Sequence, residues 1–272
     1  INIVSTGNAT SFGSFYANRT GGAAFGNSTR AYYGNGASYV THIDTITYAS
    51  GGNATDYGNA NVGRYKVCGG SNDTRGIIAG GLDSSATPTN NIQYGSLDST
   101  GSFSDFGNLG TTRSDASCTT STTRALIMGG TSADSGHLTT TEKIEIATTG
   151  NGSNFGNLGG FARNGDDGGL SSGTRAVIAI GKRSSNSNII EYYTIASASA
   201  ATDFGDLTVA RQAAGASSKV RGIFCGGVSA SGNSDTIDYI TIGTTGNATD
   251  FGDLAGGSTL CAATSAGHGG LA

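Results

Sequence analysis

The sequence of 272 residues predicts an all-β fold: one β-propeller domain, residues 1–272, with six blades of four strands each. Three observations predict this fold. An aromatic residue followed by glycine recurs at steps of 45, 49, 49, 49 and 47 residues, short apolar runs end at paired glycines, and alternating segments follow those runs. A period of about 40–50 residues is typical of propellers and solenoids. The six aromatic residues are Phe12, Tyr57, Phe106, Phe155, Phe204 and Phe251.

Each repeat predicts four strands, named a to d from the axis outward. In the copy that opens at Asp203, strand a is the small-residue segment 212–218, strand b the apolar run 220–227 and strand c the alternating segment 237–242. A continuous apolar run is typical of a buried strand, and alternation of a half-buried one. Strand d contains the aromatic-glycine mark. We expect its ring to pack between neighbouring blades and its glycine to supply a backbone conformation that other residues resist.

The marks divide the chain into blades at about 11–55, 56–104, 105–153, 154–202 and 203–249, with a sixth made of 250–272 plus 1–10. Aligning Ser11 with Asp250 places Ile1 inside a strand c and Ala272 at the end of a strand b. We therefore expect both termini to close the last blade, with strands c and d from the N-terminal segment and strands a and b from the C-terminal segment. Such closure removes exposed sheet edges, which favour aggregation.

Two arginine positions recur with the repeat. One follows the aromatic mark (Arg19, Arg64, Arg113, Arg163 and Arg211), and the other opens strand b. For the second series, recurrence in five blades favours a structural role over the alternative of an anion-binding ring. We expect these side chains to tie strand b to a neighbour by hydrogen bonds or an ion pair. The second series is Arg30, Arg75, Arg124, Arg175 and Arg221.

The composition excludes several classes of protein. Charged residues are 12% of the chain, the net charge is -4 and there is no basic stripe, so the electrostatic footprint of a nucleic-acid-binding protein is missing. No run approaches the ~18 apolar residues of a membrane-spanning helix, so we expect no membrane insertion. The four cysteines lack metal-binding spacing and are interpreted as buried free thiols, although spacing alone leaves a disulfide open.

Side chains suited to catalysis do not converge in the predicted topology. His42, His137 and His268 fall in three blades, whereas acid–base or metal chemistry needs them beside carboxylates. Asp166-Asp167 lies near the axis and is interpreted as solvated carboxylates in a polar channel, with an ion site as the alternative. We predict no catalytic residues, no metal site, no cofactor and no enzymatic activity.

Acidic residues three positions apart flank the aromatic-glycine mark, as at Asp203 and Asp206 and again at Asp250 and Asp253. We interpret them as turn residues whose carboxylates bond their own backbone. The alternative is weak calcium binding, since calcium prefers several oxygen ligands.

These features resemble kelch-type repeats. The apolar run closes with Gly226-Gly227, the alternating strand carries Tyr239, the aromatic residue is Phe251, and an arginine follows at the place of Arg211. The chain departs from the kelch pattern in having Phe or Tyr followed by glycine where kelch repeats have Trp. The stretch 221–254 is more narrowly similar to kelch-like repeats in virion structural and tail-fibre proteins of marine bacteriophages, notably those of cyanobacteria.

That resemblance implies a non-enzymatic phage virion structural protein, located in the virion or on an extracellular surface. Its propeller would serve host-surface attachment or particle assembly. The partners implied are other virion or surface structural proteins, a host-surface glycan or protein, or further copies in an oligomer or filament. Two alternatives stay open: a lectin-like carbohydrate-binding propeller of a cell-surface or extracellular protein, and a hydrolase or oxidase propeller.

The b–c loops are the predicted place for binding, because they vary most between repeats. They are expected to share one face with the d-to-a crossings. Variable loops on a rigid scaffold usually carry recognition. The candidate binding residues in these loops are Tyr39, His137, Lys182 and Arg183.

Overall fold

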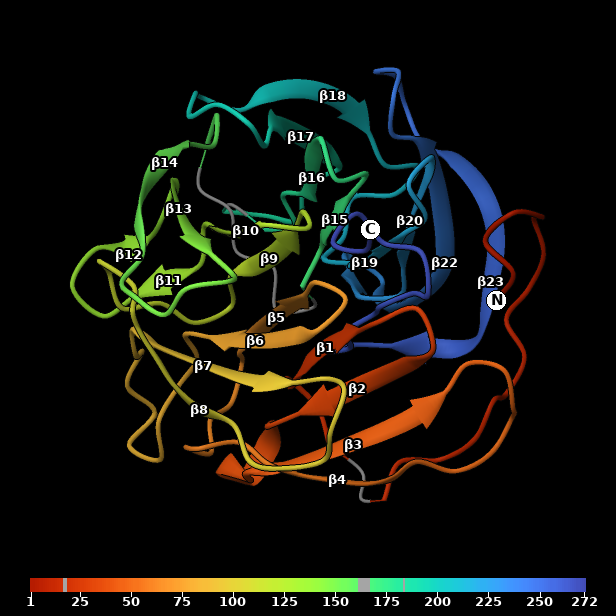
Figure 1. Ribbon diagram of the computed structural model, residues 1–272. Coiled ribbons are helices and arrows are strands. Elements are labelled where there is room, and N and C mark those ends of the chain that lie inside the picture. Colours follow the sequence, from red (N-terminus) through yellow and green to blue (C-terminus); the bar gives the residue numbers. More distant parts are fainter. Residues whose placement is uncertain (17–18, 161–166, 183) are drawn as a thin grey trace.

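The computed structural model describes residues 1–16, 19–160, 167–182 and 184–272. Five antiparallel sheets, each with four principal strands, surround a central axis (Figure 1). The strands of each sheet follow one another outward in sequence order, and the inner strands of successive blades contact one another. The prediction of an all-β propeller with four strands per blade is therefore confirmed.

The strands have the following bounds, from the axis outward. Blade 1 consists of β1 (Ala23–Gly26), β2 (Arg30–Gly34), β3 (His42–Thr47) and β4 (Thr55–Asn59), with the 3-10 helix η1 (Ala37–Tyr39) before β3. Blade 2 consists of β5 (Cys68–Ser71), β6 (Arg75–Ala79), β7 (Asn91–Ser96) and β8 (Ser104–Asn108). Blade 3 consists of β9 (Ser117–Thr120), β10 (Arg124–Met128), β13 (Thr140–Glu145) and β14 (Ser153–Asn157).

Blade 4 consists of β15 (Gly169–Ser171), β16 (Arg175–Ala179), β17 (Ile189–Thr194) and β18 (Thr202–Asp206). Blade 5 consists of β19 (Ala214–Ser217), β20 (Arg221–Cys225), β22 (Gly232–Thr241) and β23 (Thr249–Ser258). Three short strands lie in the b–c loops: β11 (Thr131–Ser132) and β12 (Gly136–His137) in blade 3, and β21 (Val228–Ser229) in blade 5.

Each aromatic-glycine mark in strand d is a β-bulge. The ladder between β7 and β8 pairs the residues on either side of Phe106 and leaves Phe106 itself without a partner. An extra residue of this kind bends the strand and re-aims its side chain. The same shift of register occurs in the pairing of strands c and d in all five blades.

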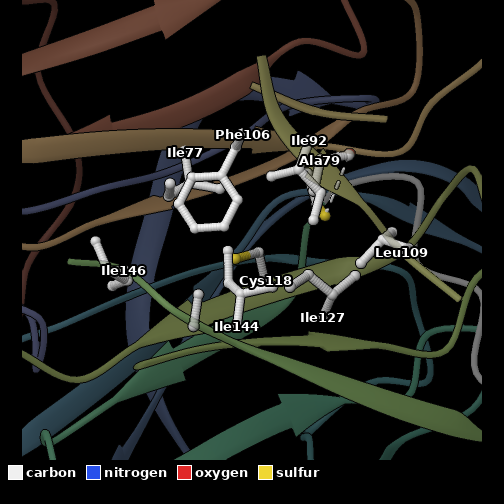
Figure 2. Packing of buried hydrophobic residues seen from close by; sticks show 12 residues of the cluster. Ile77, Ala79, Ile92, Phe106, Leu109, Cys118, Ile127, Ile144 and Ile146 are labelled. Carbon is white, nitrogen blue, oxygen red and sulfur yellow. Dashed lines mark hydrogen bonds between the residues drawn. The ribbon is translucent and has the colours of Figure 1, made fainter. Parts of the chain in front are cut away.

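The bulge turns the Phe106 ring into the core between blades 2 and 3, where it joins the buried cluster of Ile77 and Ile127 (Figure 2). Gly107 follows with a φ of 141°, and a β-carbon there would lie 2.5 Å from the carbonyl oxygen of Gly150 in the next blade. Both the conformation and the close approach require glycine. Both expectations for this mark, inter-blade packing and a special backbone, are confirmed.

An asparagine from the segment that follows around the ring caps three of the bulges, those of β8, β18 and β23. The Oδ1 of Asn151 accepts a hydrogen bond from the backbone N–H of Asn108 at 3.0 Å, and the N–H of Gly150 donates to the carbonyl of Phe106 at 2.8 Å. The repeated turn therefore fastens one blade to the next. Equivalent donor–acceptor pairs are Ser14 to Asn53, Asp206 to Asn247 and Asp253 to Asn8.

The second arginine series also joins neighbouring blades, as expected. The Nη1 of Arg75 donates to the carbonyl of Ile146 in the next blade at 2.7 Å, while its guanidinium lies 4.5 Å from the ring centroid of Tyr94. Arg124 reaches the carbonyl of Ile195 at the same distance of 2.7 Å. These arginines therefore serve the scaffold, which confirms the structural interpretation.

The predicted sixth blade is wrong, because the described residues 1–14 and 259–272 form no strand. The candidate strand b, 268–272, contains two glycines and a single large apolar residue, and glycine weakens a strand because it has no side chain to pack. This segment lies over the axis instead (Figure 1). There Nε2 of His268 lies 2.9 Å from the carbonyl oxygen of Gly26, and the N–H of Gly269 donates to the carbonyl of Ser171 at 3.1 Å.

Residues 1–3, which align with the end of a strand c, belong to no strand either. Both terminal segments therefore lie between blades 5 and 1 without pairing into a sheet.

Candidate functional site

The b–c loops share one face with the d-to-a crossings, as predicted. Isolated bridges join the two kinds of segment at Tyr65 and Leu82, at Ser114 and Thr131, and at Arg211 and Ser229. The loops themselves differ from blade to blade: a 3-10 turn in blade 1, a two-stranded hairpin in blade 3 and an extended β22 in blade 5.

The described candidate residues lie on this face but in different blades. Tyr39 ends η1 with a φ of 56°, and its ring meets that of Tyr65 edge-on at 6.4 Å. His137 lies in β12, with Nδ1 3.2 Å from Oγ1 of Thr131. Lys182 forms a bridge with Asn186, and Arg183 lies outside the described residues.

Hydroxyl side chains link the inner strands around the axis. Each donates to a backbone carbonyl of the strand before it, and this hydroxyl circuit runs around the axis from Ser265 to Gly26. Ser265 of the C-terminal segment takes part although it belongs to no strand. The donor–acceptor pairs are Ser71 to Gly26 (2.5 Å), Thr120 to Ser71 (2.7 Å), Ser171 to Thr120 (2.5 Å), Ser217 to Ser171 (2.8 Å) and Ser265 to Ser217.

Asp167 places a buried carboxylate at the axis. It accepts hydrogen bonds from the backbone N–H groups of Cys118 at 2.8 Å and Gly69 at 3.2 Å, and its own carbonyl accepts one from Gly215 at 3.2 Å. Burial raises the pKa of Asp167 to about 7, while the two N–H donors act to lower it. The interpretation as a solvated carboxylate is wrong for Asp167, which instead cross-links inner strands of four blades. Asp166 lies outside the described residues.

His42 contacts two carboxylates. Its Nε2 lies 2.8 Å from Oδ1 of the buried Asp44, and its Nδ1 lies 3.5 Å from Oδ1 of Asp56. The other oxygen of Asp44 pairs with Arg19. This carboxylate belongs to a repeated structural pair, so the cluster has a role in the scaffold of blade 1.

Sequence reasoning missed these repeated ion pairs. In blade 3, Nη2 of Arg113 lies 2.5 Å from Oε1 of Glu142, and in blade 5, Nη1 of Arg211 lies 2.7 Å from Oδ2 of Asp238. All four side chains are buried. Because the partners are 27 and 29 residues apart, only the placement of strand c beside the d-to-a crossing brings them together. The signal in the sequence was the second residue of each alternating strand: Asp44, Gln93, Glu142, Glu191 and Asp238.

Blade 2 breaks this series. Gln93 stands at the acidic position, and the buried Arg64 donates to the carbonyls of Gly80 at 2.5 Å and Asn91 at 2.7 Å. Burial lowers the pKa of Arg64 to about 10, and its Nε and Nη2 have no hydrogen-bond partner among the described residues. We expect Gln93→Glu to raise the free energy of unfolding by about 0.5–2 kcal/mol. A hydrogen bond to the charged Arg64 contributes about 1.5–3 kcal/mol, whereas losing the bond that Nε2 of Gln93 donates to the carbonyl of Val62 at 3.0 Å costs about 1 kcal/mol. Urea unfolding at pH 7 measures the change.

Asn108→Asp is the matched control for this substitution. It adds the same charge on the exposed strand d of the same blade, where two other repeats carry Asp206 and Asp253. A change within about 0.5 kcal/mol is expected there. Equal stabilisation by both variants, or a loss of stability with Gln93→Glu, contradicts the charge argument.

No family model matches the sequence, and no curated protein matches it. Among the described residues, no helix has the length and hydrophobicity to cross a membrane. The described part of the chain also holds no cluster of three or more His, Cys, Asp or Glu residues placed for a metal ion.

The acidic pairs of the aromatic-glycine mark lie within β18 and β23, so their interpretation as turn residues is wrong.

Proposed function

We propose that this propeller is a non-enzymatic binding module, and that it serves host-surface attachment or particle assembly as a virion structural protein. The supporting observation is a division within the fold. The contacts around the axis and between blades repeat, whereas the b–c loops on one face each have a different structure. Irregular loops on a repeated scaffold suit recognition of one extended partner surface. The role in a virion rests on the resemblance of 221–254 to phage repeats.

A loop exchange tests the attachment role. Replacing Asp134 and His137 of the β11–β12 hairpin with Gly and Ser is expected to reduce binding to host cells at least tenfold. The melting temperature should stay unchanged, because this hairpin is largely exposed and lies outside the four-stranded sheet. Flow cytometry with the labelled protein measures binding.

Lys219→Ala is the control, since its exposed a–b turn lies at the opposite end of strand b. Mass spectrometry of purified particles tests the virion role directly. Unchanged cell binding after the loop exchange, together with absence from purified particles, contradicts the proposal. Saturable binding of one simple sugar at several equivalent sites on a glycan array favours the lectin-like alternative instead.

A further inference from the structure

The space between blades 5 and 1, here called the seam, is bounded by the inner segment 259–267 and the outer segment 1–14. The inner segment makes the contacts of an inner strand. The N–H of Gly21 donates to the carbonyl of Leu260 at 2.9 Å, just as the N–H of Lys66 donates to the carbonyl of Gly21 at 2.7 Å. Ser265 extends the hydroxyl circuit in the same way. The position of a strand a is therefore filled.

The outer segment likewise makes the contacts that the c–d turn of a blade makes with the blade before it. The Nη1 of Arg221 donates to the carbonyl of Val4 at 2.8 Å, as that of Arg175 donates to the carbonyl of Ile242 at 2.7 Å. Asn8 caps the bulge of β23 as the other turn asparagines cap theirs. The outer elements of a blade are therefore also in position.

Between these two segments lies a mostly apolar cavity of about 640 Å³. In a complete blade this position holds strands b and c, and their side chains form the core. No Asp, Glu, Lys, Arg or His side chain lines the cavity. Its lining includes Ile3 and Phe12 from the outer segment, Ala263 from the inner segment, Ile46 from blade 1 and Ile223 from blade 5.

One wall of the cavity continues the blade–blade interface. Ile223 and Cys225 on β20 occupy the positions of Leu126 and Met128 on β10, which face the next blade. In blade 3 these positions are covered by side chains of blade 4. At the seam Ile223 and Cys225 are buried by residues of the two terminal segments, among them Ile3 and Ala263, and no described strand takes that place. The covering residues in blade 4 are Ala176, Ile178, Tyr193 and Ile195.

Exposed apolar side chains concentrate in the N-terminal segment, and two of them, Ile1 and Phe12, line the cavity. The described residues include eight exposed large hydrophobic side chains, and five of them lie within 1–16. Clustered exposure of this kind marks interaction surfaces, whereas single exposed residues do not. The five are Ile1, Val4, Phe12, Phe15 and Tyr16.

We propose that the seam is a docking site for a β-hairpin of a partner protein, whose two strands take the positions of strands b and c. Its strands would carry apolar side chains at alternate positions, to fill the cavity between Ile223 on one side and Ile46 on the other. A carboxylate on its second strand is unnecessary, because Ser258 stands where other repeats carry arginine. Strand addition of this kind combines backbone hydrogen bonds with side-chain pockets. The proposal does not depend on a role in a virion.

A synthetic peptide of residues 75–97 tests the proposal. This is the b–c hairpin of blade 2, which already carries Gln93 in place of the usual carboxylate. We expect saturable binding with one peptide per chain, measured by fluorescence anisotropy. At a free concentration one hundred times Kd, the peptide should raise the melting temperature by about 5–10 °C.

Two variants check where the peptide binds. A peptide with Ile77→Asp and Ile78→Asp is expected to bind at least tenfold more weakly. In the protein, Ile3→Asp at the seam should weaken binding to a similar degree, with its own melting temperature measured alongside. Val209→Asp, an exposed hydrophobic position outside the seam, should leave binding unchanged.

Three results would overturn the proposal. These are no saturable binding, equal binding of both peptides, or binding that Ile3→Asp leaves intact. A dimer seen by light scattering that is lost in Ile3→Asp would assign the seam to a second copy of this chain and would also overturn it.

Discussion

Replacing Glu142 with leucine is expected to lower the free energy of unfolding by about 3–5 kcal/mol, because it leaves the buried Arg113 guanidinium without its counter-charge. Both side chains of this pair are nearly inaccessible. The substitution also removes the acceptor for the backbone N–H groups of Gly110 at 2.6 Å and Thr111 at 3.2 Å. Urea unfolding at pH 7 measures the loss.

Two milder variants separate charge from packing. Glu142→Gln is expected to cost less than the leucine variant, because the native Arg64 and Gln93 of blade 2 already tolerate that combination. Glu145→Gln removes a carboxylate three residues along the chain that is 45% exposed and paired with Arg124, and such pairs contribute about 0–1 kcal/mol. Similar losses in Glu142→Leu and Glu145→Gln would contradict a dominant role for burial.

Asp167→Asn is expected to flatten the pH dependence of stability between pH 4 and pH 8. The folded protein holds the pKa of Asp167 at about 7, well above its ordinary value of 3.8. Between these values the unfolded chain is ionised while the folded chain keeps its proton, so unfolding releases a proton. Stability therefore falls as pH rises through this window and levels off above about pH 7. This difference between the two pKa values corresponds to a loss of free energy of unfolding on the order of 4 kcal/mol for a fully buried group.

Chemical unfolding at several pH values in wild type and Asp167→Asn measures this effect. The quantity to compare is the slope of the free energy of unfolding against pH. The single oxygen of the asparagine amide can accept from only one of the N–H groups of Gly69 and Cys118. This loss shifts stability by the same amount at every pH, so it leaves the slope unaffected. Asp166→Asn tests whether the effect belongs to one side chain. A wild-type curve without a fall between pH 4 and pH 7 contradicts the assignment.

Repetition explains how much of the fold could be predicted. The aromatic-glycine mark, the arginines and the alternating strands each recur, so a chance match in one repeat does not mislead the assignment. The order of the strands in each blade then follows their order in the sequence. The bulge at Phe106 and the pairing of Arg113 with Glu142 were missed because each depends on the register between strands that are far apart in sequence. Local patterns contain no such register.

The seam and the candidate site could be predicted only in part. In the structure Asn8, Leu260 and Ser265 make the hydrogen bonds of their repeat positions, yet the predicted strands did not form, because 268–272 lacks the side chains that fill a core. Asp167 occurs once at its position, so no second copy could reveal its burial. Tyr39, His137 and Lys182 lie in loops that do not repeat, and their role in binding stays a prediction.

The seam also determines where unfolding of the propeller starts. The ring has five sheets, and the junction between blades 5 and 1 is bridged by segments without a ladder, so it is the weakest junction of the circle. Blade 3 has complete neighbours on both sides, whereas blades 1 and 5 each have one. In arrays whose stability is a sum of nearest-neighbour terms, unfolding starts at the ends and moves inward. The resistance of the blades to unfolding therefore increases from blades 1 and 5 toward blade 3, which unfolds last.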